Sequence, residues 1–263
     1  MGLTPLGTVR TIRRHPVKSM AGEVVARAIA SHAGLVGDRV WAFVDPAGPA
    51  HFPWFTARGL GALVTYRARF TDPAATLSDT ALEAAWARGS GVAPPLPDDE
   101  AFAVEVTTPA GTVLRADDPR LLATLSAELG RPLVLRFATR GMQDCRPLSL
   151  VTSQTIAGFA AEAAIPADPA RFRMNIEFDW PDAAPFAENA LVGRRLAIGP
   201  RAEIAIVEPD ARCAMIGIDP ATGDSDRLVL RQLADRHAGT LGLYAAVLRE
   251  GIVATGDPVR LLD

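Results

Sequence analysis

The sequence predicts an α+β fold that is mainly β and is centred on a β-barrel. Most of its periodic segments are short runs in which apolar and polar residues alternate, which is typical of strands. Few helical segments stand between them, whereas a doubly wound parallel sheet would alternate strands with helices. The length of 263 residues is enough for one large domain or two closely joined ones.

The first half of the chain contains most of the expected strands. Alternating segments predict strands over residues 8–12, 24–30, 40–44 and 63–70, and a hairpin over 101–107 and 112–115. The glycine-punctuated segment 34–39 is expected to form a turn before the third strand. A region rich in proline and acidic residues, with Pro73, Pro94, Pro95 and Pro97, is the best candidate for a boundary between two parts.

The second half combines strands with three expected helices. Asp118 and Pro119 predict the start of a helix that Gly130 ends, and Ser153 is a plausible N-cap for a helix over 153–163. The third helix is expected over 226–237. Strands or strand-like apolar runs are expected over residues 133–137, 147–151, 171–178, 195–198, 202–207, 241–248 and 259–262.

Composition excludes several classes of protein. The net charge of −3 argues against a nucleic-acid surface, and no run of about 20 apolar residues is present to span a membrane. The first 22 residues are basic, like a transit peptide, but residues 8–12 alternate as a strand and Pro16 would break a helix. We therefore expect a mature strand and loop here, and a cytoplasmic protein.

Several common catalytic motifs are absent from the sequence. There is no phosphate-binding loop, no dinucleotide fingerprint and no Gly-x-Ser-x-Gly elbow. The four histidines are far apart and lack zinc spacing. The two cysteines, Cys145 and Cys213, exclude a disulfide-rich fold, and we expect no bridge between them in a chain without a secretion signal.

Cys213 is the strongest candidate for a chemical role. It follows Arg212 directly, after the expected strand 202–207, and a guanidinium can hold a neighbouring thiol as the thiolate that attacks electrophiles or ligates soft metals. Alternatively, Cys213 is a small buried apolar residue, or the nucleophile of a hydrolase with His237 or His15 as its base.

A set of basic and polar residues in loops and at strand ends could form an anion site. A cavity that collected several of them would grip a phosphate, because guanidinium groups bind phosphate in a bidentate manner. Taken singly, each is more often a solvated charge or a partner in a weak ion pair. The candidates are Lys18 with Ser19, Arg39, Arg58, Arg173 with Asn175, and Arg212.

Seven short segments, in order along nearly the whole chain, resemble those of the MOSC-domain family, named after the C-terminal domain of molybdenum-cofactor sulfurase. The sequence is most similar to two-part bacterial and mitochondrial members that include the amidoxime-reducing component. The segments are 15–19, 34–39, 56–58, 144–152, 171–176, 211–213 with 218–223, and 241–244 through 256–259.

The resemblance implies an N-terminal β-rich domain, residues 1–116, followed by a MOSC β-barrel domain with flanking helices, residues 117–263. It implies that Cys213 ligates molybdenum or carries sulfur. Residues that resemble those holding the molybdopterin and its phosphate are Lys18, Ser19, Arg39, Arg58, Thr152, Arg173, Asn175 and Arg212.

Two functions follow as expectations from the resemblance. The first is a molybdenum–molybdopterin enzyme that reduces N-hydroxylated small molecules, supplied with electrons by a separate ferredoxin, flavoprotein or cytochrome. Asp144 and Asp210 are weak candidates for its proton delivery. The alternative is a sulfur carrier or cofactor-handling protein that uses a Cys213 persulfide. The family is also associated with pyridoxal phosphate, but the chain is too short to add a complete desulfurase of that type.

Departures from the family pattern also lead to expectations. Met174 and Leu241 stand where proline and phenylalanine are usual, and both are expected to be packing changes. The loop 49–55, which comes before residues 56–58, is longer than usual. The proline expected soon after Arg58 is missing. Both departures affect the placement of Arg58. Trp54 and Phe55 in this loop could form a hydrophobic lid or a buried anchor.

Overall fold

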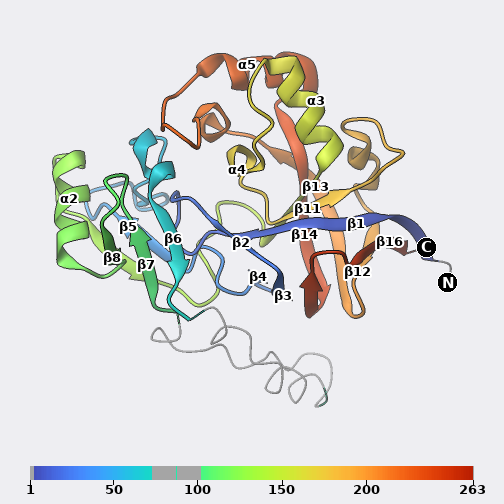
Figure 1. The fold of residues 1–263 in the computed structure, drawn as a ribbon, viewed down its shortest axis with the longest axis horizontal. Coiled ribbons are helices and arrows are strands. Elements are labelled where there is room, and N and C mark those ends of the chain that lie inside the picture. Colours follow the sequence, from blue (N-terminus) through green and yellow to red (C-terminus); the bar gives the residue numbers. More distant parts are fainter. Residues whose placement is uncertain (1–2, 73–86, 88–101, 263) are drawn as a thin grey trace.

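A closed seven-stranded barrel is the centre of the computed structural model, which describes residues 3–72, 87 and 102–262 (Figure 1). The first barrel strand closes the ring, because it pairs with the strands at both open edges. The strands, in spatial order, are β11 (Ile176–Asp179), β10 (Leu148–Thr152), β14 (Thr240–Arg249), β13 (Ala202–Ala211), β12 (Arg195–Ile198), β16 (Pro258–Leu262) and β1 (Leu3–Arg14).

Alternation in the sequence explains the packing of the barrel. Along β13, Ala202, Ile204 and Ile206 are buried while the residues between them are more exposed. These side chains belong to one apolar core inside the barrel, together with Ile12 and Phe178 from the first strand and β11. The strands of the ring thus turn one face inward, as expected for a small barrel filled by side chains.

Smaller elements extend the barrel. The short strand β2 (Glu23–Val25) pairs with β1, and β3 (Arg27–Ser31) lies between β4 (Gly34–Leu35) and β15 (Gly251–Ala254) in a second sheet. Three helices, α3 (Ser153–Ala163), α4 (Pro169–Phe172) and α5 (Arg227–His237), lie together beside the barrel (Figure 1). The 3-10 helices η2 (Ala187–Leu191) and η3 (Ala214–Gly217) complete this half.

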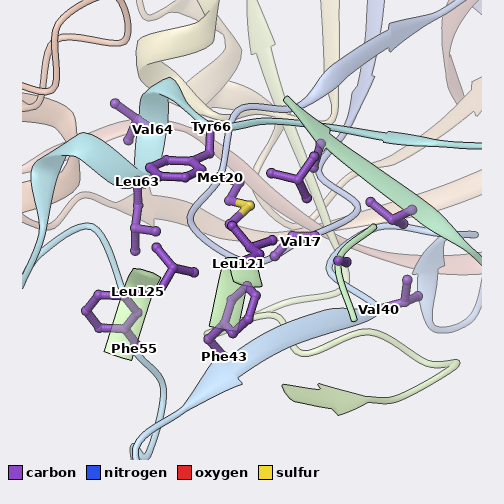
Figure 2. Close-up of a cluster of buried hydrophobic side chains, with 14 of the residues drawn as sticks. Val17, Met20, Val40, Phe43, Phe55, Leu63, Val64, Tyr66, Leu121 and Leu125 are labelled. Carbon is purple, nitrogen blue, oxygen red and sulfur yellow. The ribbon is translucent and has the colours of Figure 1, made fainter. Parts of the chain in front are cut away.

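The N-terminal part has its own sheets and core. Strand β5 (Trp41–Val44) pairs with β9 (Val134–Phe137), and β7 (Val104–Thr107) lies between β6 (Arg67–Phe70) and β8 (Val113–Arg115). Helix α2 (Pro119–Leu129) and the 3-10 helix η1 (Gly61–Thr65) cover them. Figure 2 shows the apolar side chains that these elements gather, among them Met20, Phe43 and Leu121. The predicted α+β, mainly β fold is confirmed.

The predicted ends of two helices are confirmed. Asp118 accepts a hydrogen bond from the Arg120 N–H and Pro119 is the first residue of α2, while Gly130 ends the helix with φ of 76°. Asp226 caps α5 in the same way. Helix α3 has the predicted bounds, but its N-cap is Thr152 and not Ser153.

Two predicted strands are partly wrong. In 63–70, the first residues form η1, with Leu63 and Val64 buried, and only Arg67–Phe70 is a strand. In 171–178, the chain first completes the short helix α4, capped by Asp168, before β11 begins at Ile176. Phe172, Met174, Ile176 and Phe178 are all buried, so the alternation marks burial and not a continuous strand.

The boundary between two domains at 116/117 stays a prediction. The proline-rich segment that suggested a boundary region lies outside the described residues, with Pro73, Pro94, Pro95 and Pro97. Several strand pairings cross that boundary. Strand β1 pairs with β11 and β16 in the barrel, β5 pairs with β9, and β3 pairs with β15. No helix in the described ranges is long and apolar enough to cross a membrane.

Candidate functional site

Most of the predicted site residues line one cavity of about 110 Å³. It lies where the loop after β1, the segment before β10, the turn after α4 and the end of β13 meet. The predicted residues that line it are Lys18, Ser19, Arg39, Arg58, Arg173, Asn175, Arg212 and Cys213. Distant parts of the chain thus bring seven polar or charged side chains and one thiol together.

Cys213 lies at the mouth of this cavity. It lies two residues after Ala211, the last residue of β13, and its carbonyl accepts a hydrogen bond from the Ile216 N–H in η3. The thiol is free and exposed. The alternative of a small buried apolar residue is therefore wrong, and a thiol in this position can reach a ligand in the cavity.

Arg212 is held in place by two partners inside the molecule. Its Nη1 pairs with the Asp210 carboxylate, and its Nη2 donates to the Phe172 carbonyl oxygen at 2.6 Å. Burial raises the pKa of Asp210, against the opposing effect of Arg212. Burial, and then the Asp210 charge, raises the pKa of Tyr244 on the neighbouring strand. Asp210 and Tyr244 also line the cavity.

Lys18 is almost fully buried at the opposite wall. Its Nζ donates to the Met142 carbonyl oxygen at 2.6 Å and pairs with the Asp144 carboxylate. Burial lowers the pKa of Lys18, and Asp144 partly opposes the shift. The ammonium also lies 5.6 Å from the ring centre of Trp54. Trp54 therefore contacts a residue of the cavity wall, while Phe55 is buried in the core as an anchor of the loop.

Three cavity residues have unusual backbone conformations. Ser19, Arg39 and Arg173 have φ values of 68°, 55° and 56°, in the left-handed region that side chains other than glycine rarely adopt. They are half of the six such non-glycine residues in the described ranges. Conformations of this kind are concentrated at functional sites, where the surrounding structure holds them.

Arg39 and Arg173 form the centre of a cationic cluster. Arg39 pairs with the buried Asp38 and donates to the Arg173 carbonyl oxygen at 3.2 Å. Burial lowers the pKa of Arg173 to about 9, and the neighbouring cation Arg39 adds to this shift. Burial alone would raise the pKa of Asp38, but Arg39 and His15 hold it well below its usual range.

The cluster contains donors that lack acceptors. The Nη2 of Arg173 and the Nε of Arg212 are buried and have no hydrogen-bond partner in the described part of the chain. A buried donor without an acceptor costs about 1–3 kcal/mol. An anion in the cavity would supply acceptors and offset the repulsion among the guanidinium groups.

Other predicted residues have structural partners. The Asn175 side chain accepts from the Ser149 N–H and hydroxyl and donates to the Arg13 carbonyl, so it ties β10 to β1. Thr152 does not line the cavity; its hydroxyl caps α3 and donates to buried Glu188. Arg58 is exposed and stacks on Phe52, with 4.4 Å between guanidinium and ring centre.

Three further residues line the cavity, for which the sequence predicted no role in the site. They are Gln143, Cys145 and Tyr244. Cys145 is the second free thiol, exposed like the first. It lies inside the segment 144–152, and that position could have drawn attention to it. Tyr244 likewise lies in the segment 241–244, and it pairs with Glu208 across β13 and β14.

Met174 and Leu241 are buried in the same apolar cluster beside the barrel, which confirms that these two departures are packing changes.

The residues of the complete cavity indicate its chemistry. One exposed thiol can ligate a soft metal, and several fixed guanidinium groups can hold an anionic tail. The residues therefore suit a ligand that carries both a metal and a phosphate.

Comparisons with solved structures give several matches. The YuaD protein from Bacillus subtilis is 12% identical with a TM-score of 0.47, over 97% of this chain and 94% of that one. YiiM from Geobacillus stearothermophilus is 17% identical with a TM-score of 0.34, over 45% and 55% of the two chains. YiiM from Escherichia coli is 21% identical with a TM-score of 0.35 over the same shares. No curated protein matches the chain.

Two family models match the sequence directly. The model of the MOSC N-terminal beta barrel domain matches residues 6–86, and the model of the MOSC domain matches residues 138–260. The second match contains Cys213 and the arginines beside it, and the first contains Lys18, Arg39 and Arg58. The chain therefore belongs to the MOSC-domain family.

Proposed function

We propose that the protein is a molybdenum–molybdopterin oxidoreductase that reduces N-hydroxylated small molecules. The observation that carries the proposal is the exposed Cys213 thiol at a cavity walled by fixed cations. Family membership supports a link to the molybdenum cofactor, and the resemblance to the amidoxime-reducing component supports the choice of substrate.

Different residues would hold the metal and the phosphate of the cofactor. Cys213 would ligate the metal through its sulfur, next to Arg212 in the wall of the cavity. Arg39, Arg173 and Lys18 would hold the phosphate, because all three line the cavity and the Nη2 of Arg173 has no acceptor in the described part of the chain. When bound, the molybdenum would supply the two-electron chemistry that cleaves an N–O bond.

The reaction also requires protons. Reduction of an N-hydroxyl group takes two electrons and two protons and releases water. Asp144 and Asp210 line the cavity, and each contacts a cation of its wall. Electrons would come from a separate ferredoxin, flavoprotein or cytochrome that docks on the exposed side near Cys213.

Substitution of Cys213 tests this function. In protein from a host that makes molybdopterin, we expect Cys213→Ser to lower N-hydroxy reductase activity at least 100-fold with an unchanged melting temperature, because the thiol is exposed and adds little to packing. Metal content and activity with benzamidoxime are the measurements. Cys145→Ser is the matched control, and wild-type protein without molybdenum would overturn the proposal.

A sulfur carrier remains the second candidate, because both free thiols line the same cavity. A persulfide on Cys213 could pass its outer sulfur to a second thiol without any metal. Mass spectrometry of the intact protein would then show an adduct of about one sulfur atom on Cys213, in a sample that contains no molybdenum.

A further inference from the structure

A second cavity, of about 290 Å³, lies next to the Cys213 cavity. It lies between the end of β1 and β2 on one side, and α4 and the segment after η3 on the other. Arg173 and Met215 line both cavities and separate them. Its volume is close to the lower end of the range for small-molecule sites.

The wall of this cavity carries more positive than negative charge. Among the described residues, four guanidinium groups line it, from Arg13, Arg67, Arg171 and Arg173, against one carboxylate, that of Asp168. The Asp168 carboxylate also accepts from the Ala170 N–H, as the cap of α4. The cavity therefore has an excess of cations that its own residues do not neutralise.

Two of the four arginines have partners inside the protein. Arg171 pairs with Asp219 at 2.8 Å, and Arg173 donates to the Met20 carbonyl oxygen at 2.8 Å. Arg171 still keeps one buried nitrogen, its Nε, without an acceptor in the described part of the chain.

Arg13 and Arg67 are the two that remain available. Among the described residues, neither side chain makes a hydrogen bond or an ion pair within 4 Å. Burial lowers the pKa of Arg13, and Asp168 and Glu177 offset this shift only in part. Arg67 is exposed, and no nitrogen of Arg13 or Arg67 is among the buried side-chain atoms that lack a partner, so an anion from solvent could reach both.

The backbone fixes where these two side chains start. The Arg13 N–H donates to the Asn175 carbonyl oxygen at 2.8 Å, and a bridge joins Ala21 to Arg67 at the start of β6. Apolar residues complete the wall, among them Val24, Val64 and Ile218. The cavity thus combines a cationic part with an apolar part.

We propose that this second cavity binds a small phosphate monoester through Arg13 and Arg67, separately from the ligand at Cys213. Phosphate is the anion that suits it, because a dianion can meet two guanidinium groups and accept paired hydrogen bonds from each. The apolar wall accommodates the organic part of the same molecule. The proposal does not depend on the function of Cys213.

The test is a calorimetric titration of the purified full-length protein with phenyl phosphate. We expect binding that inorganic phosphate displaces, and none with phenol. The double variant Arg13→Gln/Arg67→Gln should bind at least tenfold more weakly. The matched control is Arg69→Gln/Arg231→Gln, which removes the same charge from exposed residues outside both cavities. Its affinity should stay within twofold of the wild type.

Further measurements separate the two cavities. Arg58→Gln, in the Cys213 cavity, should leave the affinity for phenyl phosphate unchanged, and the pterin content of Arg13→Gln/Arg67→Gln should equal that of the wild type. Equal affinities in the two double variants, or weaker binding in Arg58→Gln, would overturn the proposal. Lost pterin content would overturn it too, since the cavity would then belong to the phosphate of the cofactor. If the double variant unfolds, Arg67→Gln alone gives the same comparison at an exposed residue.

Discussion

Asp38 is a buried carboxylate in the cationic cluster around Arg39. It accepts a hydrogen bond from the His15 N–H at 2.7 Å and pairs with Arg39. His15 beside it is buried, and burial, followed by the nearby Arg173, lowers the pKa of its imidazole well below 6.5. The fold therefore favours the neutral imidazole of His15 and the charged carboxylate of Asp38.

These two residues predict how stability depends on pH. The pKa of His15 is 6.5 in the unfolded chain and lower in the folded protein. At a pH between these two values, the unfolded chain binds a proton on His15 and the folded protein does not. The free energy of unfolding therefore decreases as the pH falls below 6.5. Asp38 adds a loss below its usual 3.8 for the same reason. Each group contributes a slope of up to about 1.4 kcal/mol per pH unit.

Urea unfolding between pH 7 and pH 3 measures this slope. The variant His15→Gln should have a flatter dependence between pH 6.5 and 5 and keep the steeper one below pH 4. Identical profiles for the variant and the wild type would show that His15 does not control acid stability.

For single residues, the sequence predicted which side chains could bind a ligand but not how those side chains are arranged. The cations and Cys213 could be named because few residue types bind phosphate or soft metals. Their convergence could not be predicted, because it depends on backbone conformations at Ser19, Arg39 and Arg173 that these residues do not normally adopt. For Thr152 the hydroxyl is used by a helix cap, which only the bounds of α3 reveal.

Among the elements, the turn after η3 is packed unusually closely. The Gly223 N–H donates to the Asp219 carbonyl oxygen and closes this turn. It lies against the start of η1, where a Cβ on Gly61 would be 2.2 Å from the Gly223 carbonyl oxygen. A glycine is thus needed at Gly61 for the close approach of two backbones.

We expect Gly61→Ala to destabilise the protein by about 1–3 kcal/mol, because the backbone must move to accommodate the methyl group. The shift should also disturb the pair between Asp219 and Arg171. Gly59→Ala is the matched control, since its Cβ would have its nearest contact at 3.6 Å. Chemical denaturation measures both, and equal midpoints would contradict the expectation.

Elements with local end signals were predicted well. Helices α2 and α5 carry an aspartate cap, and the strand 195–198 is bounded as expected. The chain around α4 was misread because the alternation of apolar and polar residues continues through a helical turn. The cap Asp168 and the following Pro169 were the local signal that could have corrected it.

Over the whole molecule, the first strand links the two halves of the chain. Strand β1 fills the gap in the barrel between β11 and β16, and the loop after it carries Lys18 to the cavity. The resemblance predicted the barrel, but alternation alone could not show which strands close it. Closure joins strands from opposite ends of the chain, and such pairings leave no local pattern.

The predicted second domain should not fold by itself. A fragment of residues 117–263 lacks β1, so β11 and β16 would each expose an unpaired edge. We expect this fragment to aggregate or melt without cooperativity, and co-expression with residues 1–116 to restore a compact complex. Size-exclusion chromatography and circular dichroism are the measurements, and a monomeric, cooperatively melting fragment would contradict the expectation.

The pairing of β1 with β16 also sets an order of events during biosynthesis. The ring can close only after the ribosome has released the residues of β16, when β1, made early, meets β16, made late. Until then the walls of the Cys213 cavity have no fixed positions. Loading of a bulky prosthetic group should therefore be post-translational, and the newly released chain would await it with its thiols unprotected.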